Sequence, residues 1–220
     1  MQLELIKPIK TLNKAYLKEK VSRNHIELFK KNLQQESEEN LKNVIADFLK
    51  NTWYKDEFEI NTKDRKDLVI HTGKTAKEPV GVILEVKKPS NKAEMISQAK
   101  PNAKALQELI LYYLRERVDL NNTDIKYLIV TNIYEWFIMD EVWFEKNVFR
   151  NIKLKKDYEN WKLSGKDTKF FYDSIAKAFL DEVTEELPAT YFDVRTYEKY
   201  VINTNKEDDT KLIGLYKILS

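Results

Sequence analysis

The chain has 220 residues, of which 42% are hydrophobic and 34% are charged, and its formal net charge is +2. This balance is typical of a globular protein and excludes a disordered chain, while the absence of cysteine excludes disulfides and thiolate metal sites. Two histidines argue against a multi-histidine zinc site, and no apolar run approaches the roughly 20 residues of a membrane helix. The N-terminus has no signal-peptide core, so we expect a cytoplasmic protein that does not bind a membrane.

The first third of the chain predicts an arm, a helix and a hairpin. Residues 1–36 are expected to form an arm or irregular lead-in, with a short helix over 23–35. Ser37 is a candidate N-cap, and it precedes an apolar stripe at helical spacing: Leu41, Val44, Ile45, Phe48 and Leu49. Residues 53–60 alternate in polarity, which indicates a strand or the approach to one. Strands at 66–72 and 80–88, joined by a turn-rich loop, predict a hairpin.

The rest of the chain alternates helices and strands. A long helical stretch is expected from about 93 to 118, with Pro101 near its start. Two apolar strands follow at 125–132 and 134–141, with a tight turn between them. The tail predicts helices at 155–163, 170–186 and 208–219, and an extended piece over 190–202. This order of elements indicates the α/β class, with a mixed central sheet flanked by helices.

Two charged residues interrupt the apolar strand "VGVILEVKKPS" over 80–90. Glu85 and Lys87 are two positions apart, so they share one face of the strand, and Asp67 begins the neighbouring strand. Two carboxylates that converge there predict an oxygen site for a hard cation, Mg²⁺ by preference. A nearby lysine can position water or stabilise the charge of a phosphate.

Simpler interpretations of these residues stay open. Asp67 can end a strand and pair with Arg65, and Glu85 with Lys87 can form the solvated face of an edge strand. The charges can also form an internal ion-pair cluster that gains nothing from a metal ion. If Glu85 and Lys87 are buried, each needs a partner, because burying an unpaired charge costs several kcal/mol.

The segments "DLVI" (67–70) and "EVKK" (85–88), separated by a hairpin, resemble the core motif of the PD-(D/E)XK nuclease superfamily. The order of the surrounding elements, with an amphipathic helix before the motif and a long helix after it, strengthens this resemblance. The first motif departs from the family pattern, because Lys66 stands before Asp67 where the pattern has proline. The resemblance implies a restriction-endonuclease-like core.

A narrower resemblance covers roughly residues 38–145. The stretches "ENLKNVIADFLKNTWY", "NTKDRKDLVIH", "EVKKP", "ALQELILYYLRER" and "YLIVTNIYEWFIMD" are similar to the N-terminal endonuclease domain of type IIG restriction-modification enzymes. In those enzymes a methyltransferase and a target-recognition domain follow in the same chain. The resemblance therefore implies an arm over 1–36, a nuclease core over 37–150, and a helical extension over 151–220 that connects to a methyltransferase domain in a longer parent chain.

The resemblance also implies roles for particular residues. Asp67, Glu85 and Lys87 would be catalytic, with Asp67 and Glu85 binding Mg²⁺ (Mn²⁺ can substitute) and Lys87 orienting or activating water. Glu38 shares the inward face of its helix and is a further candidate metal ligand, although a first-turn acid can equally interact with the helix dipole. The candidate DNA contacts are Lys63, Arg65, Lys88 and Gln107, with Tyr112 as a further candidate on the same helix as Gln107.

The sequence thus predicts a metal-dependent endonuclease that hydrolyses double-stranded DNA in the restriction of foreign DNA. The alternative is a non-catalytic DNA- or protein-binding module on a nuclease-like fold. Whether two copies pair transiently to cut both strands is open. His71 and Trp136 have simpler explanations, as a satisfied sheet histidine and a core aromatic. Thr131 and Asn132 end a central strand, where α/β sheets line sites, although Asn132 can also simply form the turn.

Overall fold

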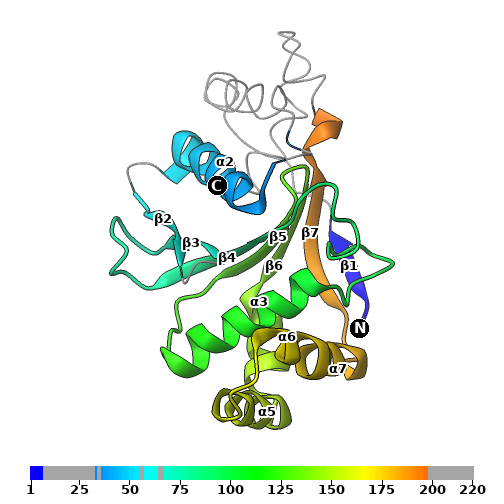
Figure 1. The fold of residues 1–220 in the computed structure, drawn as a ribbon. Helices are drawn as coiled ribbons and strands as arrows, with labels where there is room; N and C mark the ends of the chain where they lie inside the picture. The colour runs from blue at the N-terminus through cyan, green and yellow to red at the C-terminus, as the bar shows by residue number, and fades with distance from the viewer. Residues whose placement is uncertain (7–32, 34–35, 55–56, 64–66, 198–220) are drawn as a thin grey trace.

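A computed structural model of the chain describes residues 1–6, 33, 36–54, 57–63 and 67–197. Within these residues, seven strands form one mixed sheet in the order β1-β7-β6-β5-β4-β3-β2 (Figure 1). The strands are β1 (Leu3–Ile6), β2 (Ile60–Lys63), β3 (Asp67–His71), β4 (Val80–Val86), β5 (Tyr127–Thr131), β6 (Glu135–Asp140) and β7 (Leu187–Asp193). The expected α/β class with a mixed central sheet is confirmed.

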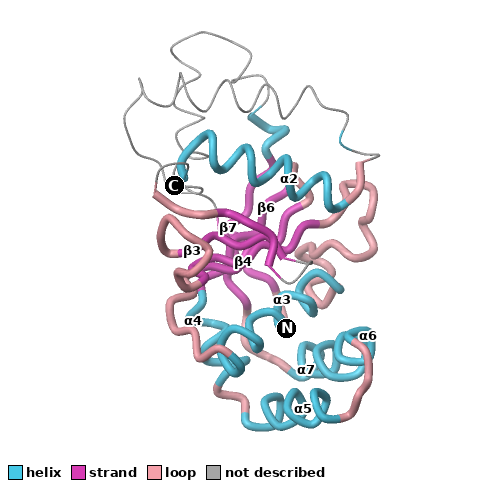
Figure 2. Tube along the Cα trace, turned by 60° about the vertical axis from the view of Figure 1, so that its left-hand side comes forward, coloured by secondary structure: helices cyan, strands magenta, loops and turns pink. Residues whose placement is uncertain are grey.

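Helices cover both faces of the sheet and make a three-layer arrangement (Figure 2). On one face lies α2 (Glu38–Leu49), and on the other lie α3 (Lys104–Leu114) and the later helices. The later helices are α4 (Glu141–Phe144), α5 (Ile152–Leu163), α6 (Thr168–Phe170) and α7 (Lys177–Glu182). Each face of the sheet therefore has a buried apolar cluster of its own.

Helix α2 forms as its sequence pattern predicts. The Ser37 hydroxyl accepts a hydrogen bond of 3.1 Å from the backbone N–H of Asn40, which satisfies one of the free donors at the helix start. Leu41 and Ile45 of the apolar stripe are fully buried against the sheet, and Val44 of the same stripe is partly buried. The cap and the stripe together fix where α2 begins and which of its faces turns inward.

The predicted hairpin of β3 and β4 is confirmed, and its register positions the site. The strands are antiparallel, with Leu68 opposite Leu84 and Val69 opposite Ile83. One step further in this register, position 67 comes beside position 85. Strand β4 is apolar on both faces because the sheet is covered on both sides, so Glu85 is a buried charge in an otherwise apolar strand.

Strand β4 runs parallel to β5, and α3 lies in the connection between them. Every residue of α3 from Ala105 to Leu114 is buried, although the helix begins after Pro101, later than the start of the expected helical stretch. The carboxyl ends of β4 and β5 meet at one edge of the sheet, as parallel neighbours must. Such an edge is where α/β sheets commonly bind ligands.

The described residues near both ends of the chain, 1–6 and 151–197, belong to the same fold as the middle of the chain. Strand β7 pairs with β6, and the apolar residues of α5 and α7 join the core cluster beneath α3. The expected division at residue 150 thus crosses a continuous sheet and a continuous core. The sequence predicts an irregular arm over 1–36, whereas Leu3–Ile6 form β1, parallel to β7. This pairing joins segments about 180 residues apart, so local pattern does not reveal it.

The expected strand over 53–60 begins later than predicted. A π-helical turn over Lys50–Tyr54 continues α2, and β2 starts only at Ile60. Tyr54 packs on the core cluster of the α2 face and contacts the ring of Phe58 edge-on, so aromatic packing overrides the local alternation. The expected helices over 23–35 (apart from Leu33) and 208–219, and the end of the extended piece over 190–202, lie outside the described residues.

Replacing Ser37 tests whether the cap fixes the start of α2. We expect Ser37→Ala to lower the free energy of unfolding by about 1 kcal/mol, because a donor at the helix start loses its partner. Ser37→Thr keeps the hydroxyl and should lose less. Urea denaturation of the three proteins measures the difference, and equal losses in both variants would contradict the capping role.

Candidate functional site

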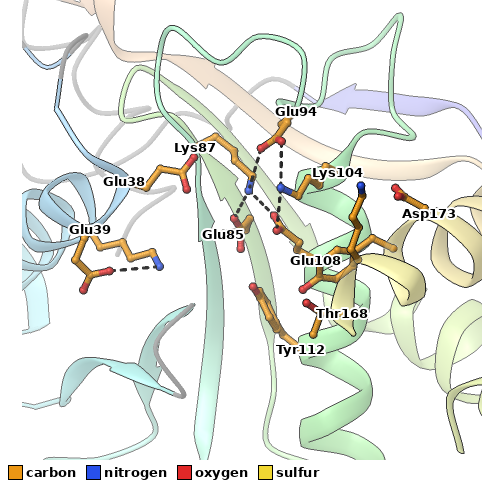
Figure 3. A pocket seen from close by; sticks show the side chains of 13 residues that line it. Glu38, Glu39, Glu85, Lys87, Glu94, Lys104, Glu108, Tyr112, Thr168 and Asp173 are labelled. Carbon is orange, nitrogen blue, oxygen red and sulfur yellow. Dashed lines mark hydrogen bonds and ion pairs between the residues drawn. The ribbon is translucent and has the colours of Figure 1, made fainter. Parts of the chain in front are cut away.

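A cavity of about 630 Å³ opens beside the carboxyl end of β4 (Figure 3). Its walls come from the first turns of α2, the end of β4, the segment that precedes α3, one face of α3, and residues 168–173. The described side chains that line it are those of Glu38, Glu39, Lys42, Glu85, Lys87, Glu94, Lys104, Glu108, Tyr112, Thr168, Lys169, Tyr172 and Asp173. Most of these side chains are charged or polar, which is unusual for a pocket this close to a core.

The ammonium group of Lys87 lies at the centre of the charged residues. Only 2% of Lys87 is exposed, and its Nζ lies 2.9 Å from Glu85 Oε1. It also donates a hydrogen bond to Glu108 Oε2, and Glu94 Oε2 lies 3.7 Å away. The sharing of one strand face by Glu85 and Lys87 is confirmed, and α3 supplies a second close carboxylate.

A second lysine extends the network toward the mouth of the cavity. Lys104 Nζ lies 3.0 Å from Glu94 Oε1 and 3.8 Å from Glu108 Oε1. Asn91 steadies Glu94, because its side-chain amide donates a hydrogen bond of 3.0 Å to Glu94 Oε2. Figure 3 shows these residues as an alternating series of ammonium and carboxylate groups.

The charged neighbours determine the protonation state of Lys87. Burial alone would lower the pKa of Lys87, but the charges of Glu85 and Glu108, together with the hydrogen bonds to them, raise it above its usual value. Lys87 therefore keeps its proton at neutral pH, so it donates hydrogen bonds and does not accept a proton. Glu108 also affects Tyr172, because burial and then the charge of Glu108 raise the pKa of that phenol to about 12.

Negative charge exceeds positive charge among the described residues of the cavity. Six carboxylates line it against four lysines, which gives a net charge of about −2 when all are ionised. Burial alone would raise the pKa of Glu94, but the hydrogen bond from Lys104 and the charges of Lys87 and Lys104 outweigh burial and lower the pKa below its usual value. Glu94 is therefore ionised at neutral pH. The net charge of the cavity favours a cation over an unaccompanied anion.

The structure brings three of the expected site residues to this cavity. Glu85 and Lys87 form its floor, and the carboxylate of Glu38 points in from the first turn of α2 (Figure 3). For Asp67 only the backbone position is described. In the register of β3 and β4, position 67 lies opposite Glu85. It is two residues from Val69, which belongs to the α3 face of the sheet.

The expected DNA contacts do not gather at the cavity. Lys88 is half-buried and is not among the lining residues, and Gln107 is buried with its amide donating a 2.8 Å hydrogen bond to Asn102 Oδ1. The side chain of Lys63 and all of Arg65 lie outside the described residues. Tyr112 does line the cavity, because it lies on the same face of α3 as Lys104 and Glu108.

The simpler interpretations of three residues are confirmed. Both ring nitrogens of His71 have partners, the carbonyl oxygen of Glu78 at 2.7 Å and Asn61 Oδ1 at 3.3 Å. Asn132 Oδ1 accepts backbone hydrogen bonds from the two residues at positions 134 and 135 and so forms the turn. Trp136 is buried in the core. None of the three lines the cavity.

The sequence interpretation missed Glu94, Lys104, Glu108 and the contribution of residues 168–173. A local signal exists for two of them, because Lys104, Glu108 and Tyr112 follow one another at intervals of four and share a helix face. No local signal exists for Glu94, which lies in an irregular segment, or for Lys169 and Tyr172, which reach the cavity only through packing of the C-terminal helices on α3.

The donor chemistry of the cavity fits a hard divalent cation, because carboxylate oxygens are the ligands that Mg²⁺ prefers. Glu85 and Glu38 are the described candidates, and position 67 adjoins Glu85. Among the described side chains, however, no group of three or more acidic or histidine residues is arranged to hold a metal ion. The described residues thus supply part of a cation site, and Lys87 serves as the counterion of Glu85 and Glu108.

The fold and the cavity together define an α/β protein with a charged site at the carboxyl end of a central strand. Comparison with protein families places the chain: it belongs to the family described as Domain of unknown function (DUF7149), whose model matches residues 6–220. No curated protein and no solved structure matches the chain. In the part of the chain that the structure describes, no helix is long and apolar enough to cross a membrane.

Removing the central ammonium tests the electrostatic account of the cavity. We expect Lys87→Met to lower the free energy of unfolding by about 3–5 kcal/mol, because buried carboxylates are left without a counterion. Lys153→Met is the matched control, since it removes an ammonium from an exposed pair with Glu182 and should cost about 0–1 kcal/mol. Urea denaturation at neutral pH measures both losses, and similar small losses would refute the account.

Proposed function

We propose that the protein is a Mg²⁺-dependent endonuclease of PD-(D/E)XK type, similar to the nuclease domain of type IIG restriction-modification enzymes. The observation that carries the proposal is that Glu85 and Lys87 form the floor of a polar cavity at the carboxyl end of β4, with position 67 on the adjacent strand. A buried Glu-x-Lys pair is expensive to maintain in a strand without a chemical purpose.

In this proposal the carboxylates of Asp67 and Glu85 hold the metal ion, and Glu38 adds an oxygen, directly or through water. When bound, Mg²⁺ (or Mn²⁺) lowers the pKa of coordinated water and offsets charge on the scissile phosphate. The surplus of carboxylates in the cavity supports binding of the cation before the phosphodiester. The cavity attracts a cation first, and the bound cation then strengthens its attraction for a phosphodiester.

Lys87 acts in this proposal as a fixed hydrogen-bond donor. Its ammonium keeps its proton and is held by Glu85 and Glu108, so it can orient the attacking water or stabilise a phosphate oxygen. Hydrolysis adds water across one phosphodiester bond: the water oxygen bonds to phosphorus, the bond to the 3′ oxygen breaks, and a proton from the water ends on that 3′ oxygen. As the resemblance implies, the products carry a 5′-phosphate and a 3′-hydroxyl.

The biological role follows the resemblance as well. The substrate would be foreign double-stranded DNA in the cytoplasm, and base recognition would fall to a target-recognition domain that, with a methyltransferase domain, belongs to a longer parent chain. The lysines at the cavity can contact phosphates, but phosphate contacts carry no sequence information. Transient pairing of two copies would then allow both strands to be cut.

One observation favours a second candidate, a scaffold whose buried charges form only an internal ion-pair cluster. Lys87 already has two close carboxylate partners without any metal ion, so the network is electrostatically complete around that residue. A scaffold of this kind gains no stability from a divalent cation. Binding of a cation to the folded protein therefore separates the two candidates.

Metal binding should be visible as a gain in stability. At a concentration of Mg²⁺ a hundredfold above its Kd, we expect the wild-type protein to gain about 2.7 kcal/mol. For a chain of this size the gain corresponds to a rise in Tm of about 5–10 °C. Glu85→Gln should show no rise, and Glu182→Gln, which alters an exposed pair, should behave as the wild type does. Differential scanning calorimetry with ionic strength held constant measures these shifts, and an unresponsive wild-type protein would support the scaffold.

Cleavage is the direct test of the proposed reaction. With Mg²⁺ or Mn²⁺ present, we expect the protein to nick supercoiled plasmid, and Glu85→Gln and Lys87→Arg to be slower by about 10²–10⁴-fold. Lys87→Arg keeps a positive charge among the carboxylates but changes the donor geometry, so loss of folding is less of a concern than with a neutral substitute. Gel electrophoresis of nicked and linear DNA measures the rates, and full activity in Glu85→Gln would exclude Glu85 from the reaction.

A further inference from the structure

Glu94 has an unusual position, because its carboxylate bridges two ammonium groups at the cavity wall. One oxygen lies 3.0 Å from Lys104 Nζ, and the other lies 3.7 Å from Lys87 Nζ (Figure 3). Two cations that share one small anion are a common arrangement for binding a phosphate, whose oxygens have a similar spacing and charge. In this structure a side chain of the protein itself supplies the anion.

The three carboxylate contacts of Lys87 differ in quality. Those with Glu85 and Glu108 are close and are buried beneath the cavity surface. The contact with Glu94 is longer than a hydrogen bond, and an ammonium group has three donors. Glu85 and Glu108 thus hold Lys87 in place, whereas Glu94 makes only an electrostatic contact with it.

The bridging carboxylate and the second lysine are also within reach of a ligand. The side chain of Lys104 is 42% exposed and that of Glu94 is 31% exposed, whereas that of Lys87 is 3% exposed. Glu94 lies in the irregular segment that precedes α3, and its carboxylate accepts one hydrogen bond from the Asn91 amide and one from the Lys104 ammonium, both of 3.0 Å. An incoming anion therefore competes with a partly exposed side chain and leaves the buried pairs intact.

We propose that Lys87 and Lys104 form a phosphate-binding pair and that Glu94 occupies it as an internal competitor until a nucleic-acid phosphate displaces it. This deepens the proposed function, on which it rests for the identity of the anion as a DNA phosphodiester. It assigns a substrate-binding role to Lys104 and a restraining role to Glu94. Binding of DNA would then expose the Glu94 carboxylate and bring the phosphate next to the Glu85 side of the cavity.

Binding of a fluorescein-labelled DNA duplex in EDTA, followed by fluorescence anisotropy, tests this proposal without any cleavage. We expect Glu94→Gln to lower the Kd by about three- to fivefold, because it removes the competing charge but keeps the shape of the side chain. Lys104→Ala should raise the Kd by about two- to fivefold for every duplex sequence, as expected of a phosphate contact. Circular dichroism and thermal melting check that each variant is folded.

Two controls separate a local effect from a general change in charge. Glu182→Gln makes the same change in net charge at an exposed pair outside the cavity, and it should lower the Kd by less than Glu94→Gln does. In the Lys104→Ala background, Glu94→Gln should lose most of its effect, because the site that it frees no longer contains two cations. Equal effects of Glu94→Gln and Glu182→Gln, or no binding by the wild type and Glu94→Gln, would overturn the proposal.

The result of the DNA-binding test does not depend on the result of the cleavage test. Tighter binding by Glu94→Gln with no metal-dependent nicking would keep the phosphate pair and reject the hydrolytic function. Nicking by the wild type with no change in Kd on replacing Glu94 would keep the nuclease and reject the competitor role. Each result thus identifies which of the two proposals has failed.

Discussion

The burial of the Lys87 ammonium is the constraint on which the rest of the site depends. A charge with 2% exposure costs several kcal/mol unless it has close counterions. Glu85 supplies one from the same strand, and Glu108 supplies the other from α3. This pair of contacts therefore ties the central strand of the sheet to the helix that covers it, and it fixes how the two elements are aligned.

The cavity around this charge draws on distant parts of the chain. The first turn of α2 contributes Glu38, the segment before α3 contributes Glu94, and the C-terminal helices contribute Lys169 and Tyr172. These helices pack on the same apolar cluster as α3. The C-terminal region is thus part of the site wall, and it supports the face of α3 that carries Glu108.

The charge balance of the cavity also orders the chemistry that it can support. Carboxylates exceed lysines among the described lining residues, so a cation is the first ligand that the cavity favours and a phosphate is the second. The internal contacts of Lys87 and Lys104 with Glu94 offset part of this charge when no ligand is present. The same residues that stabilise the protein by itself are therefore the ones that a nucleic acid would have to rearrange.

The sequence by itself determined the elements and the faces within them. The α/β class, the Ser37 cap, the β3–β4 hairpin and the shared face of Glu85 and Lys87 all follow from local periodicity, which fixes how side chains are distributed around one helix or along one strand. Only the tertiary structure decided which elements meet. Packing brought Glu108 to Lys87 and left Gln107 paired with Asn102, although the two are neighbours in sequence, because successive residues of a helix point about 100° apart. It also paired β1 with β7, since a four-residue strand obtains its hydrogen bonds from a partner that local sequence cannot indicate.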